Sequence, residues 1–516
     1  MRVALINLMT KEDHAFVNIG ALYIASSLRK AGHEVRFIDL VRYSLDENDI
    51  KKMVKDFRPD LIAFSGIITA YYQLEPLSNS LKREFGDIPQ LVGGSVGPSA
   101  VNLIERYTGA DFVCMGEGEE MAPALLREMA GGKRWEKVPN LMYRGGDGTF
   151  RKSEEQQMYI EDLDSVPYPA YDLVDMEFYI AYSTSVFSLD LGEKGRPSRI
   201  TTMVVSRGCP FSCSFCYRLI KKWRHHSIDN IIAHFRMMKE RYGITAIVLN
   251  DELIFVDRKW FISLCDAIAA SGLGLRFACG GGKPGIVTEE MIAAMKKAGF
   301  KRIGYGIESG SPKILSLMKK EVTVEKNYQA LYITHKHGII SRSNIVFGHP
   351  GEDAGTVKET MRFIESVQLL QEKFGVLDDE LQIWFATAYP GSPIYEQARS
   401  RGLIPDERGY LLRVTSQAHC HLNLSDFRSM AQLKSAVDKG LTWLDVKRSL
   451  RRKRYARVFK KLQRMIYLHI IYALTLGRCA TLNDAKRMLG LPETRPERFR
   501  ETLRKRMGCR MEGFCK

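Results

Sequence analysis

The chain has 516 residues and a mass of 58.7 kDa, which exceeds one ordinary hydrophobic core and predicts roughly two to four domains. Apolar residues make up 45% and charged residues 26% of the chain, which excludes a collagen-like or mainly disordered protein. No run of about 18 uncharged apolar residues occurs, and the N-terminus has no apolar signal core, so we expect a cytoplasmic protein. Ten cysteines in such a chain favour metal binding or catalysis over disulfides.

The net charge of +16 is concentrated at the C-terminal end. Residues 447–516 hold 21 Lys/Arg and 5 Asp/Glu, so the rest of the chain is neutral overall. This basic tail has three interpretations: a helical domain with its charges in water, a helix on an anionic membrane surface, or a docking site for an acidic protein or nucleic acid. It carries no recognised nucleic-acid motif, so we do not expect nucleic acid as a partner. Peripheral membrane contact through the tail stays open.

Residues 1–135 alternate short apolar runs with helical patterns. Strands are predicted at 3–8, 35–39, 61–65, 90–93 and 112–115, and helices at 19–29, 49–57, 71–85 and 119–129. This alternation predicts an α/β domain with a doubly wound, Rossmann-like parallel sheet, whose ligands bind beyond the carboxyl ends of the strands. Glycine-rich loops follow three of these strands, and glycine lets a ligand approach the backbone closely. The candidate binding residues in these loops are Ser65, Gly66, Ile67, Gly93, Gly94, Ser95, Gly97 and Glu117.

The remaining chain divides into three predicted parts. Residues 136–198 are interpreted as a connector, with a hairpin around 145–148 and a Pro- and Tyr-rich stretch at 166–172 that crosses the surface in extended form. Residues 199–400 show six strand–helix units, with strands at 201–206, 246–249, 275–278, 302–305, 343–347 and 381–385. These units predict a partial (β/α)6 barrel with its active site at the carboxyl ends of the strands. Residues 401–516 are predicted to be mainly helical.

The sharpest motif places Cys209, Cys213 and Cys216 directly after the first predicted barrel strand. Three thiolates in one loop can ligate three irons of a cubane cluster, which leaves the fourth iron open to another ligand. A tetrahedral zinc site needs a fourth protein ligand, and the nearby His225 and His226 keep that alternative open.

This Cys-x3-Cys-x2-Cys loop, with an aromatic residue before its last cysteine, resembles the signature of the radical S-adenosylmethionine (SAM) superfamily. Residues 250–252, 306–311, 348–352 and 389–393 resemble further motifs of that family at successive strand ends, and the resemblance covers roughly residues 1–400. It implies a [4Fe–4S] cluster on the three cysteines and SAM contacts from Asp251, Glu252, Glu308, Ser309, Asn344 and Gly348. An ordinary strand-end carboxylate remains the alternative for Glu308, and a helix N-cap for Asp251 or Glu252.

The N-terminal domain resembles the cobalamin-binding domain of the B12-dependent radical SAM class, since it directly precedes such a barrel. The resemblance implies that its glycine-rich loops cradle the corrin ring. The usual Asp-x-His-x-x-Gly ligand motif is absent, and the first 130 residues contain only His14 and His33. His33 follows a predicted helix and is interpreted as part of its C-cap. We therefore expect cobalamin bound base-off, with no histidine below the cobalt.

The resemblance implies a methyltransferase that moves a methyl group from methylcobalamin to an unactivated carbon through a 5′-deoxyadenosyl radical. The substrate class stays open between a peptide, a lipid and a small molecule, and an external donor such as flavodoxin or ferredoxin would supply electrons. One alternative is a B12-dependent cyclase or rearrangement enzyme, similar to the anaerobic cyclase of Mg-protoporphyrin ester. A non-catalytic corrinoid carrier fits the clustered cysteines poorly. A methylthiotransferase normally adds three cysteines in its N-terminal domain, where this chain has only Cys114.

The other cysteines have simpler interpretations. Cys114, Cys265 and Cys279 lie in apolar predicted strands or helices, so we expect them in the core. A second metal site is the alternative for the C-terminal residues His419, Cys420, His421, Cys479, Cys509 and Cys515.

Overall fold

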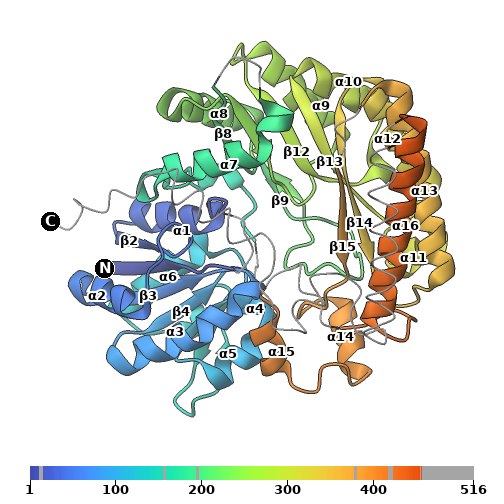
Figure 1. The fold of residues 1–516 in the computed structure, drawn as a ribbon. Helices are drawn as coiled ribbons and strands as arrows, with labels where there is room; N and C mark the ends of the chain where they lie inside the picture. Colours follow the sequence, from blue (N-terminus) through green and yellow to red (C-terminus); the bar gives the residue numbers. More distant parts are fainter. Residues whose placement is uncertain are drawn as a thin grey trace. The chain divides into compact units, whose positions relative to one another are not determined.

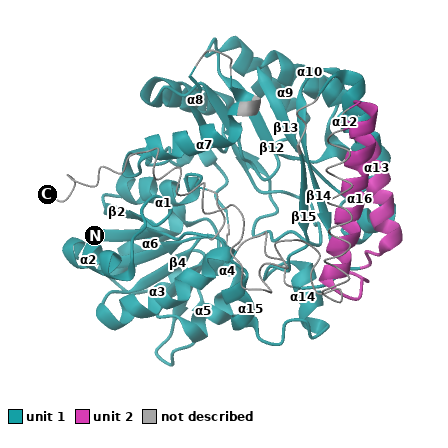
Figure 2. Cartoon of the chain, viewed as in Figure 1, with its two compact units in different colours: residues 1–350, 366–424 teal, residues 351–365, 425–516 magenta. Residues whose placement is uncertain are grey.

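The computed structural model describes residues 1–10, 15–154, 159–192, 197–376, 380–415, 422–453 and 455. The predictions on His14, on the C-terminal His/Cys group from 419 onward and on most of the basic tail lie outside these residues. The chain forms two compact units, residues 1–350 with 366–424 and residues 351–365 with 425–516, coloured teal and magenta in Figure 2. The domain boundaries expected from the sequence stay predictions.

The first sheet has seven strands in the order β2-β1-β3-β4-β5-β6-β7. Their bounds are β1 Arg2–Asn7, β2 Glu34–Asp39, β3 Leu61–Ser65, β4 Gln90–Gly93, β5 Phe112–Cys114, β6 Leu141–Arg144 and β7 Phe150–Lys152. The first five are parallel, and β6 and β7 form the antiparallel hairpin predicted around 145–148. The doubly wound fold is confirmed.

Helices cover both faces of this sheet (Figure 1). Because successive strand residues point to opposite faces, Ile6 and Phe64 pack in one core with α2 (Glu47–Phe57) and α3 (Tyr71–Glu84), while Leu5 and Ala63 pack in another with α1 (Ile19–Lys30) and α6 (Gly118–Ala130). The backbone N–H of His33 donates to the Leu28 carbonyl just past the end of α1, as the C-cap interpretation predicted. The short helices α4 (Val96–Ser99) and α5 (Val101–Tyr107) were not predicted.

The connector differs from the expected extended surface stretch. It contains the 3-10 turns η3 (Leu163–Ser165) and η4 (Tyr171–Leu173), and Val166 and Tyr171 are buried. It ends in α7 (Met176–Leu191), a helix of 16 residues whose first turn is capped by the Asp175 side chain. The sequence prediction missed α7 because apolar residues are spread around the whole helix and produce no amphipathic period.

The second sheet has six parallel strands in the order β15-β14-β13-β12-β11-β8, which confirms the partial barrel. The strands are β8 Ile200–Met203, β11 Ala246–Leu249, β12 Arg276–Gly282, β13 Phe300–Glu308, β14 Ile340–Phe347 and β15 Glu380–Phe385. The helices that follow them in the chain are α8 Ile228–Tyr242, α9 Arg258–Ala270, α10 Glu289–Lys297, α11 Pro312–Leu317, α12 Val324–Lys336 and α13 Ala354–Phe374. The first strand ends earlier than predicted, because residues from 206 onward form a separate two-stranded ribbon of β9 (Ser206–Arg207) and β10 (Arg224–His225).

Three helices follow the barrel in the described chain: α14 (Pro393–Ser400), α15 (Glu407–Arg413) and α16 (Met430–Arg451). Leu411 of α15 belongs to the same core as the N-terminal sheet. In the second unit, Lys447 of α16 forms an ion pair with Glu365 at 2.9 Å. Across the described residues, no helix has both the length and the apolar character needed to cross a membrane. Cys114, Cys265 and Cys279 are buried, as predicted for core residues.

Candidate cluster and cofactor site

The three glycine-rich loops follow β3, β4 and β5, which are neighbours in the sheet, so their loops lie at one edge. Gly94 has φ +73°, and a Cβ there would lie 2.4 Å from the Gly66 carbonyl oxygen. A Cβ on Gly97 would lie 3.1 Å from a Val113 methyl group. The loops therefore contact each other through bare backbone, and Ile67 presents an apolar side chain that is 48% exposed. This edge fits a flat, partly apolar ligand such as a corrin ring.

The cysteine loop is held by contacts within itself and by Ser214, whose backbone bonds to Met318 and Ile394. Cys209 and Cys213 are buried and Cys216 is half-buried. The Arg218 guanidinium donates to the carbonyls of Cys209 at 3.1 Å and Phe211 at 2.5 Å, and the Cys216 N–H donates to the Cys213 carbonyl at 3.2 Å. These bonds close the backbone of the loop, and a hydrogen bond joins the Cys213 and Cys216 thiols.

Positive charge surrounds the thiols. A hydrogen bond from the Cys216 thiol lowers the pKa of Cys213 to about 6, and the charges of Lys320, Arg218 and Lys283 act in the same direction. The same hydrogen bond raises the pKa of Cys216. Because an iron–sulfur cluster binds thiolates and carries net negative charge, this donor set and its cations fit a cluster.

The histidines that kept zinc open both have other partners. His225 Nδ1 lies 2.9 Å from the His226 carbonyl oxygen, and His226 Nδ1 lies 3.0 Å from the Asp164 carboxylate. Across the residues the structure describes, no three His, Cys, Asp or Glu side chains are grouped around a position for a single metal ion.

Asp251, which follows β11, connects that strand end to the segment between β8 and β9. Its Oδ1 accepts hydrogen bonds from the backbone N–H groups of Val205 and Ser206 and from the Ser206 hydroxyl at 2.8 Å. Its Oδ2 is buried and has no hydrogen-bond partner among the described residues. Burial raises the pKa of Asp251 to about 6. The N-cap alternative for Asp251 and Glu252 is wrong, because Asp257 caps α9.

The other residues predicted to bind SAM also lie at strand ends of the barrel. Glu308, at φ 65°, ends β13 and forms a buried ion pair of 2.8 Å with Lys320. Ser309 follows it and is buried. Asn344 of β14 accepts a hydrogen bond of 3.4 Å from the Trp384 indole. The remaining two residues predicted to bind SAM are Glu252, which follows β11, and Gly348, which follows β14. Direct contact of any of the six residues with SAM stays a prediction.

Lys283 and His349 were missed as site residues. Lys283 follows β12, is 5% exposed, and places Nζ 3.1 Å from the centre of the Phe211 ring. Its ammonium group makes no hydrogen bond within the described chain but forms a long ion pair of 3.8 Å with Glu321, and burial lowers its pKa. His349 follows β14, is 1% exposed, and packs edge-on against Phe215 with both ring nitrogens unbonded to any described residue. Burial lowers the pKa of His349 to about 4, so it is neutral at pH 7. His349 lies in the stretch 348–352 that resembles a family motif, but the resemblance assigned it no role, and a single lysine such as Lys283 gives no spacing signal.

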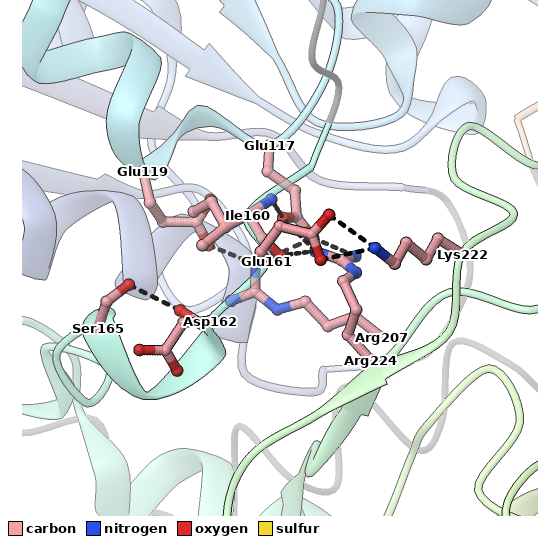
Figure 3. A network of polar contacts seen from close by, with 9 residues as sticks. All are labelled: Glu117, Glu119, Ile160, Glu161, Asp162, Ser165, Arg207, Lys222 and Arg224. Atoms are coloured by element: carbon pink, nitrogen blue, oxygen red, sulfur yellow. Dashed lines mark hydrogen bonds and ion pairs between the residues drawn. The ribbon is translucent and has the colours of Figure 1, made fainter.

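Glu117, predicted to bind a cofactor, is occupied by charged partners. Its carboxylate accepts two hydrogen bonds from the Arg224 guanidinium, at 2.8 and 2.9 Å (Figure 3). These bonds join the third glycine-rich loop to the ribbon at the base of the cysteine loop. Contact of Glu117 with a cofactor stays a prediction.

Comparisons with known proteins agree with this arrangement. The family model of the radical SAM superfamily matches residues 203–364, and that of the B12 binding domain matches residues 9–126. An uncharacterized methyltransferase of Pyrococcus horikoshii is 28% identical over 75% of this chain and 79% of its own length. The anaerobic magnesium-protoporphyrin IX monomethyl ester cyclase of Rubrivivax gelatinosus is 25% identical over 66% of this chain, which spans only 60% of that cyclase. The hopanoid C-3 methylase of Methylococcus capsulatus is 27% identical over 64% of this chain and 60% of its own length.

Two solved structures share the fold. OxsB, a cobalamin-dependent SAM radical enzyme solved with aqua-cobalamin and SAM, superposes with a TM-score of 0.67 at 18% identity, covering 98% of this chain and 71% of its own. The radical SAM methyltransferase TsrM of Kitasatospora setae, with cobalamin and a [4Fe–4S] cluster, gives 0.60 at 16% identity over 78% and 75% of the two chains. With a B12 binding domain, a radical SAM barrel and the cysteine loop on a single chain, this protein belongs to the cobalamin-dependent radical SAM enzymes.

Proposed function

We propose that the chain is a cobalamin-dependent radical SAM methyltransferase acting on an unactivated carbon. The observation that carries the proposal is the loop of Cys209, Cys213 and Cys216, which is held among cations at the carboxyl edge of the half barrel and joined at its base to the glycine edge of the B12-binding sheet. Relatives that methylate carbon or phosphonate substrates support methyl transfer as the outcome.

The cysteine loop would hold the cluster. Cys209, Cys213 and Cys216 would bind three irons as thiolates, with Arg218 keeping the loop closed through its bonds to the Cys209 and Phe211 carbonyls. When bound, the cluster supplies the electron that cleaves SAM and the corrin supplies the methyl group. Lys320 balances the negative charge of the thiolates and is itself held by Glu308.

The amino-acid end of SAM carries one carboxylate and one ammonium group, and the site offers one match for each. Lys283 has a buried ammonium group that no described residue hydrogen-bonds, and Asp251 has a buried carboxylate oxygen in the same condition. We assign Lys283 to the carboxylate and Asp251 to the ammonium of SAM. His349, neutral and unbonded within the described chain, would offer one donor and one acceptor to another polar group of the cofactor.

The glycine edge would hold cobalamin. Gly66 and Gly97 are buried and let the loops pack closely, Gly94 leaves its backbone exposed without a side chain, and Ile67 would supply apolar contact. We propose base-off binding without a histidine ligand, since His33 is engaged at the end of α1 with the N-terminal amine at 3.3 Å.

The test begins with protein purified without oxygen and analysed for iron, sulfide and cobalamin. The sample is then incubated with a reductant, SAM carrying a deuterated methyl group, and cell extract. We expect 5′-deoxyadenosine, S-adenosylhomocysteine and a deuterium-labelled product. The variant Cys209→Ala should lose 5′-deoxyadenosine formation, and retention of that activity would contradict the assignment of the cluster ligands.

A second candidate is cyclisation without methyl transfer, favoured by the similarity to the magnesium-protoporphyrin ester cyclase over two thirds of the chain. The two functions differ in one product. S-adenosylhomocysteine accumulates in step with the organic product only when methyl is transferred, whereas a cyclase makes 5′-deoxyadenosine alone.

Two partners complete the proposal. Flavodoxin or ferredoxin would supply electrons, and each can be tested by replacing the chemical reductant. The basic tail would bind anionic membrane, which vesicle flotation with and without acidic lipid tests.

A further inference from the structure

Both ends of the cysteine loop leave from one short ribbon. Arg207 of β9 lies directly opposite Arg224 of β10 in this antiparallel pair, and the three cysteines lie between them in the chain. Gly208, at φ +84°, is so close to the returning strand that a Cβ would lie 2.2 Å from the Lys222 carbonyl oxygen. The ribbon therefore anchors both ends of the cysteine loop, while Ser214 in its middle is anchored separately, by donating to the Met318 carbonyl at 2.9 Å and accepting from the Ile394 N–H at 3.0 Å.

Two glutamates at the glycine edge bind this ribbon. Glu117 forms the two-pronged pair with Arg224, and its Oε1 also lies 3.3 Å from Arg207. Arg207 pairs in addition with Glu119 at 2.7 Å. We call these four residues the Glu117 clamp (Figure 3). Its two acids come from the loop after β5 and the start of α6, and its two bases come from the ribbon of β9 and β10.

The clamp is buried and its charges balance. The exposed side-chain fractions are 4% for Arg224, 9% for Glu117, 6% for Glu119 and 17% for Arg207. The Arg207 guanidinium also lies 4.8 Å from the centre of the Tyr23 ring. Buried charges are costly to desolvate, and within the described chain only the Nε of Arg224 lacks a hydrogen bond in its guanidinium group, so the paired geometry favours one arrangement over its alternatives.

Neighbouring contacts restrict the clamp further. The backbone N–H of Ile160, in the connector, donates to Glu117 Oε2 at 2.6 Å. On the barrel side, Asp251 accepts hydrogen bonds from the backbone N–H and the hydroxyl of Ser206, the residue before Arg207. The ribbon is thus fastened to both sheets at once.

We propose that Glu117 is a positioning residue whose clamp sets the separation between the cluster and the corrin. This inference rests on the proposed function, because it assumes that the cysteine loop holds the cluster and the glycine edge holds cobalamin. A substrate would have to reach both cofactors, so a small displacement between the cysteine loop and the glycine edge would separate the chemistry that each cofactor supplies.

The experiment compares Glu117→Gln with Glu161→Gln. Gln keeps the shape of Glu117 but replaces one acceptor oxygen with an NH2 group that faces an arginine. Glu161 belongs to the outer part of the same network, where it pairs with Lys222 at 2.6 Å, but both side chains are about half exposed, at 55% and 48%. The exposed pair therefore serves as the matched control.

The first readout needs no cofactor. Hydrogen exchange of the cofactor-free chain should be about tenfold faster or more at Ile160 and at residues 203–208 in Glu117→Gln, and unchanged in Glu161→Gln. The second readout is the EPR spin–spin interaction between the reduced cluster and cob(II)alamin in the reconstituted chain. In Glu117→Gln this interaction should become weaker, and the spread of its strengths should widen. The iron and cobalt contents should stay at the level of the unmodified chain.

A double variant separates position from stability. The double variant with Glu117→Met and Arg224→Met removes both charges of the pair. Its melting temperature should be higher than that of Glu117→Gln, which leaves Arg224 buried without its partner, whereas the spin interaction should stay as weak as in Glu117→Gln. An unchanged spin interaction in Glu117→Gln at full cofactor content would overturn the clamp and leave the proposed function intact. A chain that binds neither cofactor would instead overturn the proposed function, and exchange at Ile160 would still decide whether Glu117 fastens the connector.

Discussion

At the scale of single residues, the clearest signs of function are buried polar atoms without a partner. Most buried polar groups in folded proteins are hydrogen-bonded, so each exception calls for an explanation. Near the cysteine loop, Lys283, His349 and the second oxygen of Asp251 lack hydrogen bonds among the described residues, although Lys283 also lies 3.8 Å from the Glu321 carboxylate. All three follow barrel strands at the edge where a ligand is expected. A cofactor that supplies the missing partners accounts for them together.

Lys283 gives the sharpest test of this explanation. Lys283→Met keeps the apolar stem over Phe211 but removes the charge, so SAM affinity should fall about 10- to 100-fold, the range for one charge-assisted hydrogen bond. Equilibrium binding of SAM to the reconstituted chain measures the effect. Lys301→Met, an exposed lysine on β13, is the control and should bind SAM normally. Equal affinity in both variants, at equal iron content, would remove Lys283 from the SAM site.

Asp251 predicts a dependence of stability on pH. Its pKa is about 6 in the folded chain against an ordinary value of 3.8, so folding favours the protonated form. The free energy of unfolding therefore falls as pH rises from about 4 through 6, and roughly 1 kcal/mol of this fall lies between pH 5 and 7. Asp251→Asn keeps the accepting oxygen and loses the charge, so the difference in stability between variant and unmodified chain should grow by that amount over this range. Denaturant unfolding at both pH values measures it, and a constant difference would contradict the raised pKa.

Sequence reasoning reached part of this site. The sequence predicts the cluster ligands Cys209, Cys213 and Cys216, because a cluster needs several thiols at short, fixed spacing. It does not predict Lys283 and His349, because their significance lies in burial and missing partners, which only the fold reveals. Glu117 shows the opposite case: its place after a strand suggested ligand binding, but partners about a hundred residues away, such as Arg224, occupy its carboxylate.

At the scale of elements, glycines at positive φ determine where backbones can meet. Gly208 and Gly148 have nearly the same φ, +84° and +82°, but a Cβ at Gly208 would lie 2.2 Å from a carbonyl oxygen, while at Gly148 nothing lies within 4 Å. Gly148→Ala should therefore cost only the strain of the left-handed conformation, about 1–2 kcal/mol. Gly208→Ala adds a backbone clash that must move the ribbon of β9 and β10.

The measurement for this pair is iron bound after anaerobic reconstitution, together with the melting temperature. Gly148→Ala should bind iron fully, and Gly208→Ala should lose most of it. Full iron in Gly208→Ala would show that the cysteine loop tolerates movement of its base.

The predictability of the elements follows from their burial. Buried parallel strands such as β11 read as unbroken apolar runs, and the predicted 246–249 matches Ala246–Leu249. Helix α7 escaped prediction because its sequence has no polar face. The early end of β8 escaped it because the apolar pattern continues through Val204 and Val205 while the chain turns away to form the ribbon. The apolar pattern of the sequence predicts which residues are buried, but it does not predict which element they pack against.

At the scale of the whole molecule, helix α15 near the end of the described chain packs into the core of the N-terminal sheet. Leu411 of α15 is fully buried in the core that contains Ile62 and Phe64 of the N-terminal sheet, and α15 packs against α3. Arg408 of the same helix pairs with the buried Glu75 of α3 at 2.6 Å. The sheet that carries the glycine edge is therefore completed by residues more than 300 positions further along the chain.

This shared core predicts a long-range effect of Leu411. Leu411→Ala removes buried methyl groups and leaves a cavity, which should cost about 2–5 kcal/mol of stability. Because that cost falls on the core under the glycine edge, the variant should also release cobalamin faster, although Leu411 lies far beyond the matched B12-binding residues 9–126. Leu450→Ala, at a side chain that is 46% exposed, should change neither quantity by a measurable amount. The rate of cobalamin loss, followed by absorbance, measures this effect. If Leu411→Ala is destabilised but keeps its cobalamin as well as the unmodified chain does, the glycine edge is stable without the packing of α15.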